Sequence, residues 1–470
     1  MGLLLAGVLF AGVLVAGPGR AGAAPGDLDT GFSSDGKVTT DVGTVDAGRA
    51  VAVQPDGKIV VAGYSLVAGE YVFAVLRYGA DGSLDTSFSG DGIQTVDVGA
   101  GHDLAYSVGL QSDGKIVLGG ASGLGGANSD MAVVRLTTSG ELDTTFSADG
   151  LVTVHFGWGD DIAADLAISN DGKIVLAGYG SNGSDLDVAV ARLTSTGALD
   201  TSFSGDGKVL VPVGSGADYG NAVALAADGD VVVAGSSVGS TEDIAVVRLT
   251  STGVLDTSFS GDGITTVPVG SGDDLARAVA IAADGDLILA GTADVTAGST
   301  TEDIAVVRLT PAGALDTAFS VDGMTTVAVG SGDDEGRGLV VSADGRIVVV
   351  GESHDGTSDD VAVVRLTSAG ALDTGFSSDG KATIAVGSAS DIGHAVALTA
   401  DWRLVVAGSS TGTDDDVLVV SVDATARPGT PTGLAATAGN GQVALSWTAP
   451  TVTGGSAITG YAVESSADGG

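Results

Sequence analysis

The nine residues Leu84–Gly92 read LDTSFSGDG, and close variants of this stretch occur seven times along the chain. The seven copies begin at Leu28, Leu84, Leu142, Leu199, Leu255, Leu315 and Leu372, so that successive copies lie 56 to 60 residues apart. A period this regular indicates repeated supersecondary units, and the repeat therefore decides the fold.

Each unit contains four strand-like segments. In residues 199–254 they are LDTSFSGDGKVLVPVG, YGNAVALAADG, DVVVAGSS and EDIAVVRLTSTG. Val and Thr favour strands, whereas Gly and Asp favour turns. An Asp-Gly pair such as Asp228-Gly229 separates the second and third segments in six units, and we expect a tight two-residue hairpin there. The seventh unit has Asp401-Trp402, so we expect its turn to differ.

Four strands in each of seven units predict an all-β fold, a seven-bladed β-propeller over residues 28–424. A β-solenoid is the alternative, although its repeats usually have shorter periods. The last unit ends near Ala424 with no further LDTxF stretch. We therefore expect the N-terminal strand, within residues 28–43, to complete the last blade and close the ring, which removes two exposed edges. A ring without a borrowed strand is the other possibility.

The repeated letters are interpreted as architecture, because catalysis needs one asymmetric group of residues rather than seven identical ones. The motif Leu and Phe would fill the space between adjacent blades. An Arg recurs in six AVVRL segments, and Ser421 takes its place in the seventh. We expect each Arg to pair with the motif Asp that follows it, as Arg248 with Asp256, and so to fix the blade geometry.

A second repeated carboxylate opens the pattern Asp-x-(Ala/Gly)-x before each YGNAVAL-type strand. These residues are Asp46, Asp103, Asp161, Asp218, Asp274, Asp334 and Asp391. If that strand is innermost, the seven carboxylates surround one mouth of the central channel and could hold a cation. The alternative is that each Asp accepts hydrogen bonds from its own turn.

The last residue of this four-residue pattern varies from unit to unit. It is Arg49, Tyr106, Ala164, Asn221, Arg277, Arg337 and His394 in the seven units. Variation against a fixed background is what a ligand-reading surface shows, and it is also what unconstrained solvent positions show.

One stretch departs from the repeat consensus with chemically useful residues. Residues 154–161 read VHFGWGDD, and His155, Trp158, Asp160 and Asp161 are the candidate ligand-binding residues. A Trp beside carboxylates suits stacking on a sugar ring. The alternative is a Trp that fills a gap between blades.

The composition excludes several classes of protein. The chain carries 59 acidic and 19 basic side chains, a formal charge of −40, and such a chain repels nucleic acid phosphates. It has no cysteine, so disulfides, thiolate metal sites and cysteine nucleophiles are excluded. No His-Glu-x-x-His pair, P-loop, Gly-x-Ser-x-Gly elbow or EF-hand pattern occurs. We expect no catalytic residue and no cofactor, with Ca²⁺ as a possible ion at the Asp-rich turns.

Residues 1–23 resemble a secretory signal peptide, with an apolar stretch from Leu3 to Gly17 and cleavage after Ala23. An uncleaved anchor is the alternative, but this stretch is shorter than the ~20 residues of a membrane span. We expect a secreted or cell-surface protein, with no membrane insertion after cleavage, that is a monomer.

The pattern DIAVVRLTSTGxLDTSFSGDG…AVAxxxDGKIVVAG resembles the delta-60 repeat family of bacterial β-propellers over residues 28–424. This resemblance implies a secreted or surface-associated propeller and carries over no catalytic residue. After a linker at residues 425–430, residues 431–470 resemble the first half of a fibronectin type III domain. Pro431, Leu434, Trp447 and Tyr461 match its pattern. We expect a truncated β-sandwich segment there, since complete domains have about 100 residues.

These observations predict a non-enzymatic binding or scaffold protein that recognises a glycan or an extracellular protein through loops on one propeller face. The alternative is an extracellular hydrolase or lyase that acts on polysaccharide with carboxylates at the channel mouth. A structural spacer is a third possibility.

Overall fold

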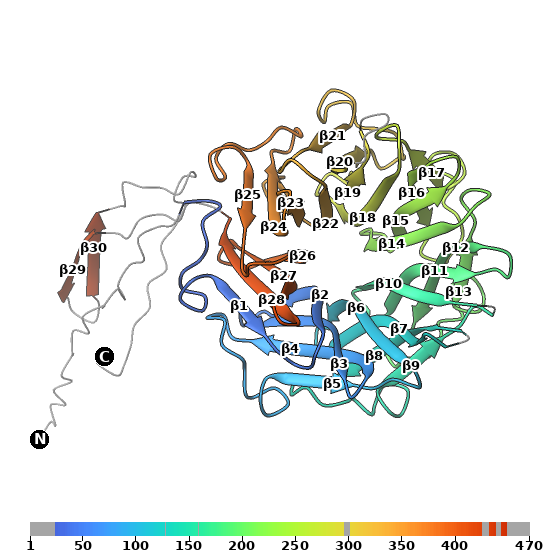
Figure 1. Ribbon diagram of the computed structural model, residues 1–470, viewed down its shortest axis with the longest axis horizontal. Coiled ribbons are helices and arrows are strands. Elements are labelled where there is room, and N and C mark those ends of the chain that lie inside the picture. Colours follow the sequence, from blue (N-terminus) through green and yellow to red (C-terminus); the bar gives the residue numbers. More distant parts are fainter. Residues whose placement is uncertain are drawn as a thin grey trace, which may run out of the picture.

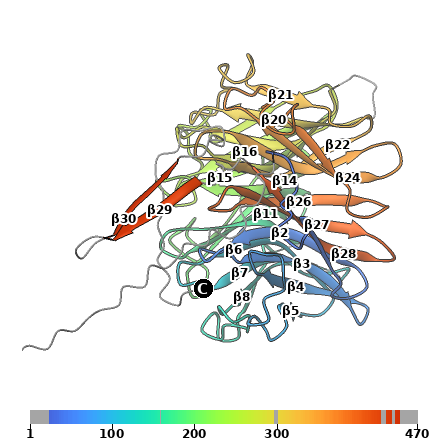
Figure 2. The same ribbon diagram turned by 90° about the vertical axis from the view of Figure 1, so that its left-hand side faces the viewer.

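The computed structural model describes residues 24–126, 128–157, 159–295, 301–424, 432–438 and 443–448. Seven four-stranded antiparallel sheets surround a central axis as the blades of a propeller (Figure 1). Seen edge-on, the blades form a disc (Figure 2). The described residues include no helix that is long and apolar enough to cross a membrane.

Each blade uses its strands in the same order from the axis outward. The innermost strands are β2 (Asp46–Val53), β6 (His102–Leu110), β10 (Asp161–Ile168), β14 (Asp218–Leu225), β18 (Asp274–Ile281), β22 (Asp334–Val341) and β26 (Asp391–Leu398). The second strands are β3 (Ile59–Val67), β7 (Ile116–Leu124), β11 (Ile174–Ser181), β15 (Val231–Val238), β19 (Leu287–Ala293), β23 (Ile347–His354) and β27 (Arg403–Thr411).

The third strands carry the AVVRL segments. They are β4 (Glu70–Tyr78), β8 (Asp130–Leu136), β12 (Leu186–Leu193), β16 (Glu242–Leu249), β20 (Asp303–Leu309), β24 (Asp359–Leu366) and β28 (Asp415–Asp423). The short outer strands are β5 (Ile93–Val96), β9 (Leu151–Val154), β13 (Lys208–Val211), β17 (Ile264–Val267), β21 (Met324–Val327), β25 (Lys381–Ile384) and β1 (Lys37–Thr40).

The predicted N-terminal closure is confirmed. Strand β1 pairs with β28, with Lys37 opposite Val420 and Thr40 opposite Val417, so the seventh sheet has the order β1-β28-β27-β26. The strand occupies only the end of the predicted range of residues 28–43, because the LDTGF letters before it form turns. Closure satisfies the edge of β28 and joins the two ends of the propeller.

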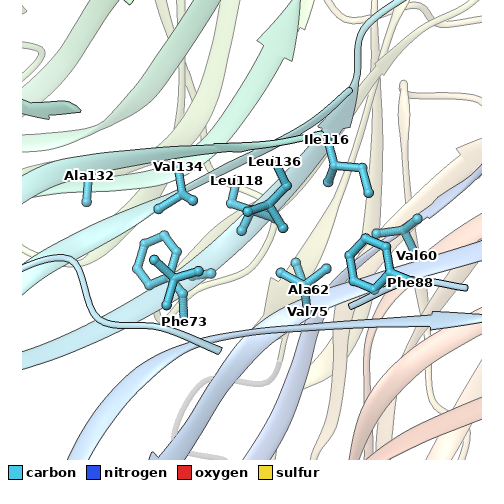
Figure 3. Packing of buried hydrophobic residues seen from close by; sticks show 12 residues of the cluster. Val60, Ala62, Phe73, Val75, Phe88, Ile116, Leu118, Ala132, Val134 and Leu136 are labelled. Atoms are coloured by element: carbon cyan, nitrogen blue, oxygen red, sulfur yellow. The ribbon is translucent and has the colours of Figure 1, made fainter. Parts of the chain in front are cut away.

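The hydrophobic core is divided among the interfaces between neighbouring blades. Between the first two blades, Phe73 and Val75 of β4 pack with Leu118 of β7 and Val134 of β8 (Figure 3). The motif residue Phe88 belongs to the same cluster. All seven motif phenylalanines, from Phe32 to Phe376, are buried, which confirms the packing role predicted for the motif Phe. The motif leucines are at most partly buried, and Leu142 and Leu199 are each 36% exposed, so the packing role predicted for the motif Leu is borne out only in part.

The predicted Arg–Asp pairs are also confirmed. In all six units that carry the Arg, its Nε lies 2.8 to 3.0 Å from Oδ2 of the motif Asp. Arg77 also donates to the carbonyl oxygen of Thr138 in the next blade at 2.6 Å, and its guanidinium lies 4.6 Å from the centre of the Phe88 ring. The last blade has Ser421 where the other blades have the Arg. There Nη1 of Arg403, on β27, lies 3.0 Å from Oδ2 of the motif residue Asp29.

The Asp-Gly turns differ from the expected two-residue hairpins. In the first blade Gly57 N–H donates to the carbonyl of Gln54, and the Gln54 N–H donates to the carbonyl of Lys58. Only Gly57, at φ 84°, has a positive φ, so this is a three-residue loop with a type I turn and a left-handed glycine. The seventh blade forms the same turn with Trp402 at φ 64°, which a bulky residue rarely adopts.

Two further strands, β29 (Thr432–Ala438) and β30 (Val443–Thr448), pair with each other in antiparallel fashion. They lie in the segment predicted to resemble a fibronectin type III domain. Pro431 and Tyr461, like the signal peptide and the linker, lie outside the described residues. The fibronectin-like segment therefore stays a prediction.

Candidate functional site

Every innermost strand has a β-bulge at the same place. In the pairing of β2 with β3, the register skips one residue, Arg49, between Gly48 and Ala50. The skipped residues of the other blades are Tyr106, Ala164, Asn221, Arg277, Arg337 and His394. These are the seven variable positions of the repeat. A bulge leaves its extra residue unpaired and redirects the side chain, so the fold turns the variable residue of each unit toward the axis.

A glycine that recurs on each second strand makes room for the bulge. In the fourth blade it is Gly235, and a Cβ built on it would overlap the carbonyl oxygen of Tyr219. The same overlap with an inner-strand carbonyl occurs at the equivalent positions, which are Gly63, Gly120, Gly178, Gly291, Gly351 and Gly408. Each unit therefore has a glycine at this position of its second strand, whereas the bulge residue of its inner strand differs from unit to unit.

The seven bulge side chains line one axial pocket of about 440 Å³. Asp165 and Tyr179 of the third blade also line it, together with small apolar residues of the inner strands. The pocket is asymmetric, because three of its bulge positions are arginines and these come from blades 1, 5 and 6. A chain of formal charge −40 thus gathers three cations at its axis.

Two of these arginines belong to an ion-pair network. Arg277 Nη2 lies 3.1 Å from Glu335 Oε2, and Arg337 Nη2 lies 2.9 Å from the same oxygen. Arg337 Nη2 also lies 2.8 Å from Glu352 Oε1. Burial raises the pKa of Glu352, and the neighbouring Arg337 opposes this shift. The Nε atoms of both arginines are buried without a hydrogen-bond partner, so the network leaves donors in the pocket wall.

Arg49 has no carboxylate partner among the described residues. Its Nη1 lies 3.3 Å from His394 Nε2, and its guanidinium lies 5.8 Å from the centre of the Tyr106 ring. Burial lowers the pKa of Arg49, and the charges of Arg337 and Arg277 lower it further. A guanidinium stays protonated in a protein, so this positive charge is incompletely compensated. Burial and the same arginines hold the pKa of His394 well below its usual value, which keeps the imidazole neutral.

Two tyrosines, Tyr106 and Tyr179, line the pocket, and three more lie close to them. The rings of Tyr64 and Tyr71 meet edge to face at 5.4 Å, and those of Tyr179 and Tyr219 at 5.1 Å. Between these pairs stands Tyr106, whose pKa is raised to about 12, chiefly by burial. All five rings are partly exposed and come from blades 1 to 4. Partly exposed aromatic rings next to cations suit a ligand with both apolar faces and negative charge.

Asp165 is the acidic member of the pocket. Its carboxylate accepts hydrogen bonds from Leu166 N–H at 2.8 Å and Val223 N–H at 2.9 Å. Burial nevertheless raises its pKa to about 6. The equivalent residues of the other blades are small, namely Ala50, Ser107, Ala222, Ala278, Gly338 and Ala395. Asp165 was not among the predicted site residues, although its departure from a small-residue consensus is the sequence signal that indicates it.

The residues singled out in the VHFGWGDD stretch lie partly together. His155 and Asp161 line a second cavity of about 490 Å³ with Asp130 and several glycines. Asp160 accepts a hydrogen bond from Ser129 N–H at 2.9 Å, and Asp161 accepts one from Phe156 N–H at 2.6 Å. Burial raises the pKa of Asp161. Trp158 lies outside the described residues, so sugar stacking there stays a prediction.

The seven carboxylates expected at the channel mouth are buried at the start of the inner strands. Each accepts hydrogen bonds from backbone N–H groups of its preceding turn, as Asp274 does from Val269 and Gly270 at 2.7 and 2.9 Å. The equivalent bonds are made by Asp46, Asp103, Asp161, Asp218, Asp334 and Asp391. No three of these seven carboxylates come within 4.8 Å of one another in the described part of the chain. The structure thus shows the turn-forming role, and a cation shared by the ring stays a prediction.

Comparison with known proteins supports a propeller family. Six segments match a family model described as a domain of unknown function (DUF5122) beta-propeller, at residues 54–88, 111–146, 169–203, 226–259, 282–319 and 342–376. Each match runs from the hairpin between the first two strands of a blade to the motif Phe. No curated protein matches the chain. The delta-60 assignment stays a prediction.

Several solved structures share the architecture. Sqt1 from Chaetomium thermophilum is 15% identical, with 78% of this chain and 80% of that chain covered and a TM-score of 0.42. A protein of unknown function from Dyadobacter fermentans DSM 18053 is 14% identical, with 83% and 99% covered and a TM-score of 0.43. An ulvan lyase, a polysaccharide lyase bound to -[GlcA(1-4)Rha3S]-, is 12% identical, with 82% and 96% covered and a TM-score of 0.47. Similarity this low carries no argument about function.

Proposed function

We propose that this propeller is a secreted or cell-surface binding protein that recognises an acidic glycan at its axial pocket. The observation that carries the proposal is Arg49, a cation that faces the pocket beside Arg277 and Arg337 and pairs with no carboxylate in the described part of the chain. A uronate or sulfate group would supply the missing counter-charge. Tyr106 and Tyr179, which line the pocket, would stack on the sugar rings.

The overall acidity of the chain does not oppose this assignment. At physiological salt, exposed charges are screened over about 8 Å, so the groups within the pocket determine the affinity. The distant acidic surface would slow the approach of a polyanion at low salt, and it would exclude nucleic acid, which presents phosphates over a much longer surface. An apolar stretch at residues 1–23 supports a location outside the cell.

The test uses trigalacturonate as the probe and its methyl ester as the uncharged control. Isothermal titration should show binding of the acid and at least tenfold weaker binding of the ester. Arg49→Gln should weaken binding of the acid by roughly 10- to 100-fold, the range of a hydrogen bond to a charged group. Arg346→Gln is the matched control, because it removes the same charge from a side chain that pairs with Asp344 and Asp373 outside the pocket. Equal affinity for acid and ester, or an unchanged affinity in Arg49→Gln, contradicts the proposal.

A lyase is the second candidate, and one observation favours it. The neutral imidazole of His394 lies beside Arg49, which is the pairing that β-elimination from a uronate requires. The arginine would neutralise the carboxylate and the imidazole would accept the proton α to it. The electron pair of the broken C–H bond would form the new double bond as the C4–O glycosidic bond breaks, and water would protonate the leaving oxygen. Appearance of the ultraviolet absorbance of an unsaturated uronate during incubation, and its loss in His394→Ala, would assign this activity. Binding without such a product would leave the pocket as a recognition site.

A further inference from the structure

Three carboxylates meet where the propeller ring closes. Asp41 lies in the loop between β1 and β2, Asp46 is the first residue of β2, and Asp416 lies on β28. One oxygen from each lies within 4.8 Å of the others. The three residues thus come from the last blade, from the first blade and from the segment that joins them. They lie apart from the bulge residues of the axial pocket.

Asp46, the buried member of this cluster, has a carboxylate oxygen without a partner. Asp46 is 0% exposed, and its Oδ2 accepts hydrogen bonds from Val42 N–H at 2.6 Å and Gly43 N–H at 2.9 Å. Its Oδ1 is buried without any hydrogen-bond partner. None of the three carboxylates forms an ion pair with Lys or Arg in the described part of the chain. A buried carboxylate oxygen without a donor is costly unless a cation binds it.

We propose that Asp41, Asp46 and Asp416 bind one Ca²⁺ ion that fastens the last blade to the first. Calcium binds oxygen at 2.3 to 2.6 Å, so two ligands on opposite sides of the ion lie about 4.8 Å apart. The spacing of the three oxygens meets this limit. Magnesium binds at about 2.1 Å and demands a closer, octahedral set, so it fits the cluster less well.

The other blades explain why the site occurs only at the closure. Where the fourth blade meets the fifth, Asp243 and Asp274 correspond to Asp416 and Asp46, but the position of Asp41 is Pro268. In the sixth blade the residue that corresponds to Asp41 is Ala385. At both junctions two carboxylates remain and the third ligand is missing. Where the first blade meets the second, Asp97 corresponds to Asp41, but Val72 takes the place of Asp416. In the described part of the chain the three acids therefore come together only at the closure.

The experiment is calcium titration of the full chain, by isothermal titration and by thermal unfolding. We expect one Ca²⁺ per chain with a dissociation constant of about 0.1 to 1 mM, the range of extracellular sites of low charge count. Calcium should raise the unfolding midpoint, and the same concentration of Mg²⁺ should raise it less. Asp41→Asn and Asp416→Asn should each weaken calcium binding at least tenfold. Asp41 is exposed, so its variant tests the site without disturbing the fold.

The matched control is Asp360→Asn, because Asp360 occupies the position of Asp416 in the sixth blade and should leave calcium binding unchanged. Absence of calcium binding by the wild-type chain up to 10 mM overturns the proposal, and so does binding that survives in both Asp41→Asn and Asp416→Asn. Equal weakening in the control shows a general effect of surface charge, which also overturns it. Saccharide binding at the axial pocket is measured separately, so either proposal can fail alone.

Discussion

Replacement of Asp165 by Asn should remove a pH-dependent destabilisation. Folding raises the pKa of this carboxyl from 3.8 to about 6, because the group is buried at the axial pocket. The native state therefore binds this proton more tightly than the unfolded chain, and the stabilisation present below pH 4 is lost as the pH rises through 6. Each tenfold change in proton affinity is worth about 1.4 kcal/mol, so ionised Asp165 costs up to ~3 kcal/mol.

The assay is urea unfolding of the wild type and Asp165→Asn between pH 4 and pH 7.5. The two proteins should be similar in free energy of unfolding near pH 4, and the variant should be about 2 to 3 kcal/mol more stable at pH 7.5. Asp91→Asn, in an exposed turn, is the control and should follow the wild type throughout. A constant difference between wild type and Asp165→Asn across this pH range refutes the reasoning.

Three further substitutions test the architecture by urea unfolding. Gly235→Ala should destabilise by about 3 kcal/mol, because its Cβ overlaps a carbonyl oxygen of the bulged strand, whereas Gly239→Ala, with only ordinary contacts, should change little. Arg192→Ala should cost about 1 to 3 kcal/mol, because buried Asp200 loses Arg192 and keeps only Lys173 as a cation partner, and an apolar replacement of both Arg192 and Asp200 should recover most of this loss. Trp402→Gly should stabilise by about 1 kcal/mol, since it relieves a left-handed conformation at the expense of some chain entropy, and a loss of stability would show that the indole packs usefully.

The repeated features of the fold could be predicted because each is written several times. Seven copies of one motif fix the number of blades, and the copy that stands before the first complete unit, with none after the last, predicts the closure by β1. The Arg–Asp pairing was predictable from the fixed spacing between the two residue types. Ser421 replaces the Arg in the last blade, so Asp29 lacks the usual cation there, and Arg403 supplies one instead.

The candidate site could be predicted only in part. The position that varies between units was visible in the sequence. That its seven side chains converge on one pocket depends on the β-bulge, and a one-residue change of register is not apparent from a period-two pattern. Glu335 and Glu352 lie on different strands, so their shared contact with Arg337 follows from strand pairing rather than from spacing. The prediction of a two-residue turn was wrong for a similar reason. Asp-Gly is compatible with both a two-residue and a three-residue hairpin loop, and the register of the flanking strands decides between them.

Asp165, whose ionised carboxyl destabilises the fold, should also control binding at the axial pocket. Loss of its proton adds a negative charge to the pocket that the three arginines line and so reduces the attraction for an acidic saccharide. His394 is already neutral, and the pKa of Tyr106 is raised to about 12, so neither changes charge between pH 5 and pH 7.5. Trigalacturonate should therefore bind the wild type several-fold more tightly at pH 5 than at pH 7.5, while its own carboxylates stay mostly ionised. Asp165→Asn should bind with the higher affinity at both values, and a pH dependence that persists in this variant would place the titrating group elsewhere.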